Sequence, residues 1–204
     1  MTELRLDNVT KRFGHRRVLE GVCAEVRLGE ALVVTGYNGS GKSTLLSLIA
    51  GLQRPDSGEI ALRIDGAPVS DDLRRREVGY VAPDLTLYPE LSAWENLEFF
   101  ARVRGQAWST DQAEATLEHV GLPGRGRDLV GTFSSGMRVR MKYAVALQTA
   151  PRFLLLDEPT AMLDAHGAEL VENLIAEQRR RGILVLATND PSETRHGDLF
   201  LHLG

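Results

Sequence analysis

Residues 31–51 read ALVVTGYNGSGKSTLLSLIAG, and this stretch decides the fold. The apolar run 31–35 is typical of a buried parallel strand, and residues 42–50 have the spacing of a helix that stops at Gly51. Between them, residues 36–43 fit the pattern G-x-x-x-x-G-K-[ST], in which glycines let consecutive backbone N–H groups wrap around phosphate oxygens. The order of strand, glycine loop and helix therefore predicts an α/β fold with a phosphate cradle.

The helix after the loop directs its positive N-terminal end at the bound phosphates. In this pattern Lys42 contacts the β- and γ-phosphates, and the hydroxyl of Ser43 ligates Mg²⁺, so we expect ATP and Mg²⁺ as ligands. The residues expected to line the nucleotide are Gly36, Tyr37, Asn38, Gly39, Ser40, Gly41, Lys42, Ser43 and Thr44.

A second buried strand is expected at residues 153–156, and Asp157 and Glu158 follow it. Ligands of open α/β sheets bind at the C-terminal edge of the strands, which places both carboxylates at the cradle. Asp157 is expected to hold Mg²⁺ through a water, and Glu158 to polarise the water that attacks the γ-phosphorus. Without the cradle upstream, a solvated acidic turn would be the better interpretation. We expect Glu158 and Lys42 to be catalytic.

Residues 133–137, FSSGM, precede a helix expected over residues 137–148. The segment resembles the signature of the ATP-binding-cassette (ABC) ATPases, roughly LSGGQ, and the resemblance runs from Leu4 to the C-terminus. It implies that the signature contacts ATP held by a second chain, so that a homodimer encloses two ATP. Taken alone, the segment would be a Ser-Gly turn that caps a helix. The residues implied in this contact across the dimer are Ser134, Ser135 and Gly136.

The resemblance assigns two further roles. Phe13 matches the aromatic on which adenine stacks, although a single phenylalanine is more often a core residue. Asp164 matches an aspartate that communicates across the dimer. It is also the expected N-cap of a helix over residues 165–181 that ends at Gly182, and both roles can coexist.

Two positions depart from the family pattern near the γ-phosphate. Where the family has a glutamine that touches Mg²⁺ and the attacking water, this chain has Pro83 and then Asp84, which either partly replaces the glutamine or is a turn residue. Where the family has a histidine, this chain has Asn189. An amide donates a hydrogen bond to an anion but cannot become positively charged. We expect Asn189 to act as a catalytic donor.

The fold class implied is α/β, a P-loop NTPase with a RecA-like core of the ABC ATPase type, as a single domain over residues 1–204. Alternation in residues 3–30 and a strand at residues 59–64 predict a small antiparallel β subdomain on the adenine side. An inserted α-helical subdomain is expected at about residues 85–148.

The helical subdomain has capping-box patterns at Ser92 and Ser109, and it is rich in aromatic residues. In transporters of the family, a short helix of the membrane subunit docks beside the glutamine loop, and such docking favours exposed aromatics. We therefore expect permease subunits to dock near residues 83–94. The aromatic residues of the subdomain are Tyr88, Trp94, Phe99, Phe100 and Trp108.

Composition excludes several classes of protein. The 204 residues, 43% of them hydrophobic, suffice for one well-cored unit. The lone Cys23 gives no intramolecular disulfide, residues 1–9 are too charged for a signal sequence, and no apolar stretch approaches a membrane span. A net charge of −4 without a basic tail argues against nucleic acid as a partner. We expect a peripheral protein on the cytoplasmic face of the cell membrane.

These features imply the ATP-hydrolysing subunit of an ABC transporter that drives export by separate membrane subunits. The short chain and the variants at Pro83 and Asn189 look most like the ATP-binding subunit of the cytochrome c biogenesis haem exporter, although exporters of drugs, polysaccharides or lipids could share them. A soluble ABC ATPase acting on DNA or ribosomes would need a long coiled coil or a second cassette. A small-molecule P-loop kinase would lack residues 133–136.

Overall fold

The computed structural model describes residues 1–204, and its centre is a parallel sheet in the order β6-β7-β8-β3-β9. Strands β7 and β8 are buried along their whole length because other elements cover both faces. Asp157 and Thr35 stand at the same C-terminal edge, since both strands pair with β8 in parallel register. The strands are β3 (Ala31–Thr35), β6 (Val78–Val81), β7 (Phe153–Asp157), β8 (Ile183–Ala187) and β9 (Leu199–His202).

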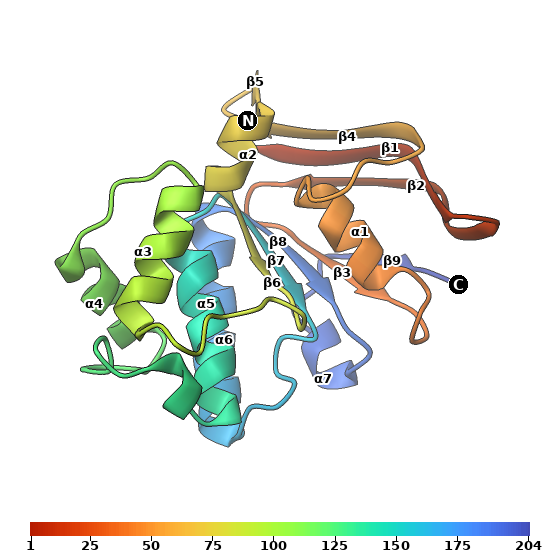
Figure 1. The fold of residues 1–204 in the computed structure, drawn as a ribbon. Helices are drawn as coiled ribbons and strands as arrows, with labels where there is room; N and C mark the ends of the chain where they lie inside the picture. Colours follow the sequence, from red (N-terminus) through yellow and green to blue (C-terminus); the bar gives the residue numbers. More distant parts are fainter.

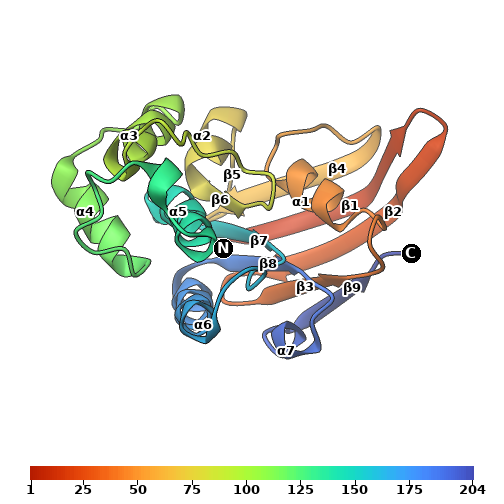
Figure 2. The ribbon, with the colours of Figure 1, turned by 60° about the horizontal axis from the view of Figure 1, so that its bottom comes forward.

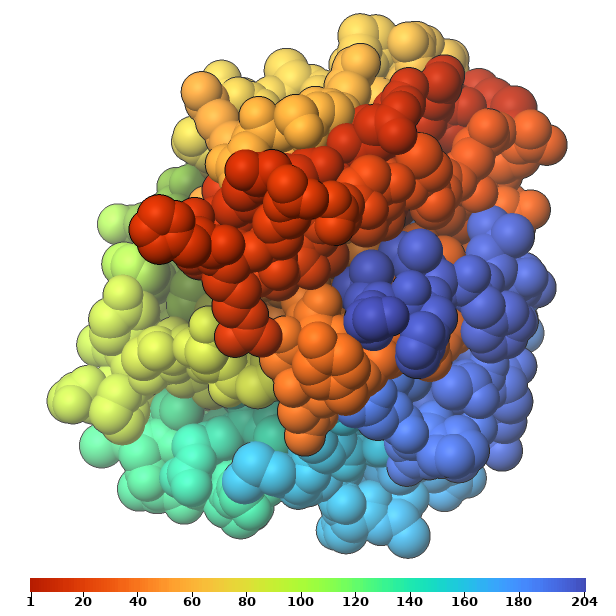
Figure 3. Space-filling model, turned by 90° about the vertical axis from the view of Figure 1, so that its right-hand side faces the viewer, coloured from red at the N-terminus to blue at the C-terminus, as the bar shows by residue number.

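A second, antiparallel sheet in the order β2-β1-β4-β5 covers one side of helix α1 (Lys42–Ile49), so that α1 lies between the two sheets (Figure 1). Leu4, Leu6 and Val9 of its inner face join the core around α1. The N-terminal strands, in red, run along the upper part of the face in Figure 3, with the C-terminal segment in dark blue beside them. The strands are β1 (Glu3–Phe13), β2 (Arg16–Arg27), β4 (Ser57–Ile64) and β5 (Ala67–Pro68).

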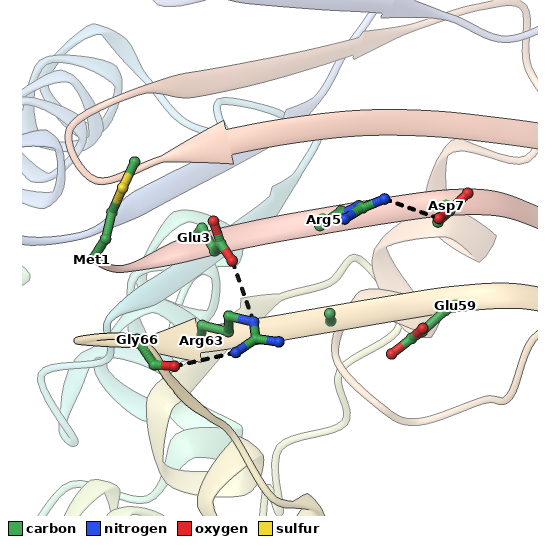
Figure 4. A pocket seen from close by; sticks show the side chains of 8 residues that line it. Met1, Glu3, Arg5, Asp7, Glu59, Arg63 and Gly66 are labelled. Carbon is green, nitrogen blue, oxygen red and sulfur yellow. Dashed lines mark hydrogen bonds and ion pairs between the residues drawn. The ribbon is translucent and has the colours of Figure 1, made fainter.

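The outer face of this antiparallel sheet carries charged side chains, because alternate residues of a strand point to opposite faces. They line a shallow pocket (Figure 4), where Arg63 Nε lies 3.3 Å from Glu3 Oε1 and Arg5 Nη2 lies 3.1 Å from Asp7 Oδ2. Four of these charges form ion pairs on a solvated surface, and Glu59 lines the pocket without one. The residues of this pocket form a polar exterior.

Helices cover the other face of the parallel sheet (Figure 2). Alternate strand residues such as Leu154 and Leu184 join their core, whereas Leu155 and Val185 face α1. Helix α2 has no counterpart among the expected elements; Ser70 caps it and two aspartates follow in its first turn. Helix α2 (Asp71–Glu77) lies instead beside β4, where Arg74 Nη2 donates to the Ile60 carbonyl oxygen at 3.2 Å. The other helical segments are α3 (Ala93–Val103), α4 (Thr110–His119), the 3₁₀ turn η1 (Val130–Thr132), α5 (Ser135–Leu147), α6 (Ala165–Arg181) and α7 (Pro191–Thr194).

Serine side chains cap the N-terminal ends of three helices in this part of the chain. Ser92 and Glu95 form the expected capping box. Ser109 accepts from the backbone of Gln112, but the reciprocal half of the box is not formed. Helix α5 begins at Ser135 rather than at residue 137, because the Ser134 side chain accepts from the backbone N–H of Met137 and caps it.

The architecture confirms the α/β fold with an antiparallel sheet and a helical insertion before β7. None of its helices combines the length and the apolar character that crossing a bilayer requires.

Candidate nucleotide site

A cavity of about 320 Å³ lies at the C-terminal edge of the parallel sheet and brings together most of the residues expected to bind nucleotide. Arg16 and Val18 of β2 also line it, and sequence motifs gave no signal for them. Of the expected cradle residues, Gly36, Tyr37 and Ser40 do not line the cavity. The lining residues are Phe13, Arg16, Val18, Asn38, Gly39, Gly41, Lys42, Ser43, Thr44, Pro83, Asp157 and Glu158.

The loop between β3 and α1 keeps its path because glycine occupies its tightest positions. Gly41 has φ 108°, and a Cβ there would lie 2.7 Å from Cγ1 of Val18. Gly36 has φ 147°, and its Cβ would lie 2.2 Å from the carbonyl oxygen of Leu203. A side chain at either position would collide with its neighbours and add backbone strain. The loop therefore has a cradle shape that other residues could not produce.

Lys42 is 6% exposed, and its ammonium binds the first residues of the loop. The Nζ atom donates to the carbonyl oxygens of Gly36 at 2.7 Å and Tyr37 at 3.4 Å. From the antiparallel sheet, Arg16 Nη2 donates to the Gly39 carbonyl oxygen at 2.9 Å. Two cationic side chains thus contact the loop, and their positive charge favours binding of a polyphosphate. Tyr37 itself is 64% exposed.

Asp157 lies beside Ser43 in a position suited to Mg²⁺. It is 4% exposed, and its Oδ2 atom has no hydrogen-bond partner. Burial raises the pKa of this carboxyl, although the Ser43 hydroxyl and the Lys42 ammonium act in the opposite direction. Carboxylate and hydroxyl oxygens are the ligands that Mg²⁺ prefers, so these residues fit a metal between them and the phosphates.

Glu158 follows Asp157 with its backbone in the left-handed region, at φ 51°. Its N–H donates to the carbonyl oxygen of Ala187 at 2.9 Å, which fixes it to the end of β8. Burial raises the pKa of its carboxyl, and the Lys42 ammonium opposes that shift. A carboxylate whose pKa is raised is a better proton acceptor than a free one.

Asn189 lies against the phosphate loop, because its Nδ2 donates to Oδ1 of Asn38 at 3.1 Å. The preceding residue, Thr188, is attached to the end of β3 through a bond from its N–H to the Val34 carbonyl oxygen at 3.1 Å. Asn189 is exposed. Its amide therefore borders the phosphate loop, although Asn189 does not line the cavity.

Phe13 stands at the end of β1 and is 50% exposed, so it is not a core residue. Lys11 Nζ lies 5.5 Å from the centre of its ring. An exposed ring at the mouth of the cavity offers a face on which a base could stack.

The loop at residues 82–84 is held by its backbone. Lys142 of α5 donates from Nζ to the Ala82 carbonyl oxygen at 3.2 Å and also to the carbonyl oxygen of Pro83. Pro83 lines the cavity, whereas Asp84 does not. The negative charge of Asp84 contributes to the raised pKa of Asp157. Lys142 had no signal in the sequence beyond its place in a basic stretch.

The signature residues are not brought to the cavity of their own chain. Ser134 and Ser135 are exposed and Gly136 is half-buried, at the N-terminal end of α5. Asp164 caps α6, with Oδ1 accepting from the Gly167 N–H at 2.8 Å. Neither group lines the cavity that the P-loop forms.

Fold and cavity together define a P-loop NTPase. A family model described as ABC transporter matches residues 19–161, so the chain belongs to the ABC transporter family, whose ATP-binding domains bind ATP with Mg²⁺ and hydrolyse it to power transport.

Three curated relatives are similar to this chain over most of its length. The chain is 32% identical over 190 residues to the linearmycin resistance ATP-binding protein LnrL of Bacillus subtilis, covering 91% of this chain and 60% of the relative. It is 41% identical over 198 residues to the Fe(3+) ions import ATP-binding protein FbpC of Streptomyces coelicolor, covering 93% and 56%. It is 38% identical over 199 residues to the lipoprotein-releasing system ATP-binding protein LolD of Chromohalobacter salexigens, covering 91% and 82%. The chain thus spans less than two thirds of the first two relatives.

A solved structure agrees along almost the whole chain. The ATP-binding cassette MJ0796, a dimer in a post-hydrolysis state bound to ADP and Pi, matches with a TM-score of 0.86 and 29% identity, covering 98% of this chain and 94% of that one.

Proposed function

We propose that this chain is the ATP-hydrolysing subunit of an ABC transporter, working as a dimer beneath separate permease subunits. The observation that carries the proposal is the pair Asp157 and Glu158 at the mouth of a glycine cradle, in a cavity that the signature of the same chain does not reach.

In this proposal the chain holds and activates the reactants with its own groups. The loop amides and Lys42 bind the β- and γ-phosphates, and Phe13 stacks on adenine. Ser43, and Asp157 through a water, would hold Mg²⁺, which would neutralise charge on the phosphate oxygens when bound. Glu158 accepts the proton of the water whose oxygen bonds to the γ-phosphorus as the bond to ADP breaks. Asn189 donates a hydrogen bond to the γ-phosphate.

The signature is proposed to complete a second chain's site. Residues 134–136 form the first turn of a helix, where unpaired N–H groups attract anions. Because they do not line the cavity of their own chain, we propose that the γ-phosphate they contact belongs to a partner. Asp164, which caps α6, is proposed to relay contacts across the same interface. The dimeric state of the MJ0796 cassette supports a homodimer.

We propose that permease subunits dock near Pro83–Trp94. A groove of about 440 Å³ opens there between the loop that follows Pro83 and the start of α5. Beside it Tyr88 is 39% exposed and Phe99 38%, with ring centres 4.7 Å apart. Trp94 is the less accessible aromatic, since its Nε1 donates to Glu114 Oε2. Attachment through this groove would place the chain at the cytoplasmic face of the cell membrane. The groove residues are Leu85, Leu87, Pro89, Val130, Gly131, Ser135, Arg138, Val139, Lys142 and Met162.

For the cargo, haem export in cytochrome c biogenesis is the narrower hypothesis, and the variants at Pro83 and Asn189 support it. The matched relatives are named for linearmycin resistance, Fe(3+) import and lipoprotein release. Export of a drug, a lipid or a polysaccharide is the alternative, and one of the matched relatives is named for import rather than export. Mass spectrometry of the membrane proteins that co-purify with the chain would name the permease and decide between them.

The test of the proposed function uses Glu158→Gln, which keeps the side-chain shape and removes the base. We expect this variant to retain ATP, to stop releasing phosphate and to accumulate an ATP-bound dimer measured by light scattering. Adding Ser135→Arg to it should abolish the dimer, because the new side chain brings bulk and charge into the joint. Phosphate release at the unmodified rate by Glu158→Gln would refute the proposal.

A further inference from the structure

The turn that follows Glu158 is hydrogen-bonded to side chains of two helices. Glu158 has φ 51°, a region that non-glycine residues adopt only when their surroundings enforce it. The next residues, Pro159 and Thr160, form a turn closed by the bond from the Ala161 N–H to the Glu158 carbonyl oxygen at 3.1 Å. The direction of the Glu158 side chain therefore depends on what fixes this turn.

One attachment comes from the helix that begins with the signature. Tyr143 of α5 is fully buried, and its hydroxyl donates to the Pro159 carbonyl oxygen at 2.7 Å. A phenylalanine would fill the same space in this apolar core, so packing alone does not require the hydroxyl. The oxygen of Tyr143 serves to bind the turn.

The other attachment comes from helix α7, which begins just after Asn189. Glu193 is 4% exposed, and its Oε1 accepts from the N–H of Thr160 at 3.1 Å and from the Thr160 hydroxyl. Its second oxygen, Oε2, is buried without a partner. A carboxylate in such a place is costly to bury, and the bonds that offset this cost all go to Thr160.

We propose that Tyr143 and Glu193 are positioning residues for hydrolysis: from two different helices they hold the turn Pro159–Thr160 so that the Glu158 carboxylate faces the cradle. The inference rests on the proposed role of Glu158 as the base. One attachment comes from α5, whose first turn carries the signature, and the other from α7, which begins two residues after Asn189. The base is thereby fixed relative to Asn189, which is proposed to donate to the same γ-phosphate.

The experiment compares Tyr143→Phe and Glu193→Leu with the unmodified protein in steady-state phosphate release. The first variant removes the donor to Pro159, and the second removes the acceptor of both Thr160 bonds. We expect kcat to fall about tenfold in each variant, since each loses buried hydrogen bonding that orients the base, while KM for ATP stays within about twofold. The control is Thr116→Val, which removes a hydroxyl-to-carbonyl bond of 2.8 Å in α4, remote from the cavity, and should leave both parameters unchanged.

A second pair of variants keeps the test valid if Tyr143→Phe does not fold. Thr160→Val removes the hydroxyl that Glu193 accepts from, and Thr160→Ser keeps it, so the serine variant should rescue kcat and the valine variant should not. Thermal unfolding scans verify that every variant is folded at the assay temperature.

Three results have distinct meanings. If Glu158→Gln lacks turnover but Tyr143→Phe and Glu193→Leu keep the full kcat, the positioning role is refuted and the proposed function stands. A parallel change of kcat and KM in the two variants would likewise refute positioning, because it would show a general structural effect. If Glu158→Gln itself keeps its turnover, the proposed function fails first.

Discussion

The Asp157 carboxylate should lower the stability of the nucleotide-free protein and raise the stability of the protein with bound Mg²⁺ and ADP. The variant Asp157→Asn tests both effects. The carboxylate is 4% exposed with one oxygen unpartnered, and burial raises its pKa despite the nearby Lys42 ammonium. A buried, unpartnered polar oxygen costs about 1–3 kcal/mol. A neutral amide costs less to bury than a carboxylate, so we take the low end, about 1 kcal/mol, as the gain. For a chain of 204 residues, that gain corresponds to a rise in Tm of roughly 2–4 °C.

The pH dependence follows from the direction of the pKa shift. Because the pKa of Asp157 is raised in the folded protein, ionisation of this group costs stability above its folded pKa. The advantage of Asp157→Asn should therefore be full at pH 7 and shrink as the pH falls through the folded pKa towards the ordinary value of about 4. Ligand should reverse the order: Mg²⁺ and ADP at about 100 times Kd add roughly 2.7 kcal/mol to the unmodified protein and less to Asp157→Asn, which loses a residue that holds Mg²⁺.

The assay is thermal unfolding followed by circular dichroism, in EDTA at pH 7 and pH 4.5, and with Mg²⁺ and ADP at pH 7. Asp72→Asn is the control, because Asp72 is an exposed aspartate paired only loosely with Arg75, at 3.7 Å. A Tm for Asp157→Asn below that of the unmodified protein in EDTA at pH 7 would refute the reasoning, since the charge would then be stabilising without metal.

Three further predictions concern the cradle. Lys42→Ala should weaken ATP binding about 10- to 150-fold, the equivalent of about 1.5–3 kcal/mol for a charged hydrogen bond, as measured by titration with a fluorescent ATP analogue; unchanged affinity would exclude Lys42 from the site. Asn189→Ala should lower steady-state phosphate release, whereas Asn189→His should equal or exceed the unmodified rate; equal rates for Asn189→Ala and the unmodified protein would exclude a catalytic role. Gly41→Ala should destabilise the fold by about 1–2 kcal/mol in urea, because φ 108° and the close Val18 oppose any Cβ, and an unchanged midpoint would show that the loop yields.

Local patterns sufficed for the elements that hold the cradle. Periodicity and the placement of glycines predicted three of these elements from signals that lie within a few residues of each element. They are the strand at residues 31–35, the helix from Lys42 and the strand that ends at Asp157. The antiparallel sheet was also predictable, because alternation in β2 and the turn before β4 are local signals.

The remaining parts depend on partners distant in sequence. Glu193 binds Thr160 across 33 residues, and Lys142 binds Ala82 across 60 residues. No periodicity relates such positions, and the apolar neighbours of Tyr143 predicted only that its ring would be buried. Helix α2 was different: Ser70 followed by two acidic residues is a start signal that the sequence did contain.

Lys142 grips the loop at residues 82–84 through carbonyl oxygens, and every amino acid supplies a carbonyl oxygen. The course of the chain past the cavity is therefore independent of which side chains stand at residues 82 and 83. A glutamine and a proline can be exchanged there without releasing the grip. The backbone path of this loop can therefore stay the same while the side chains that it presents to the cavity change.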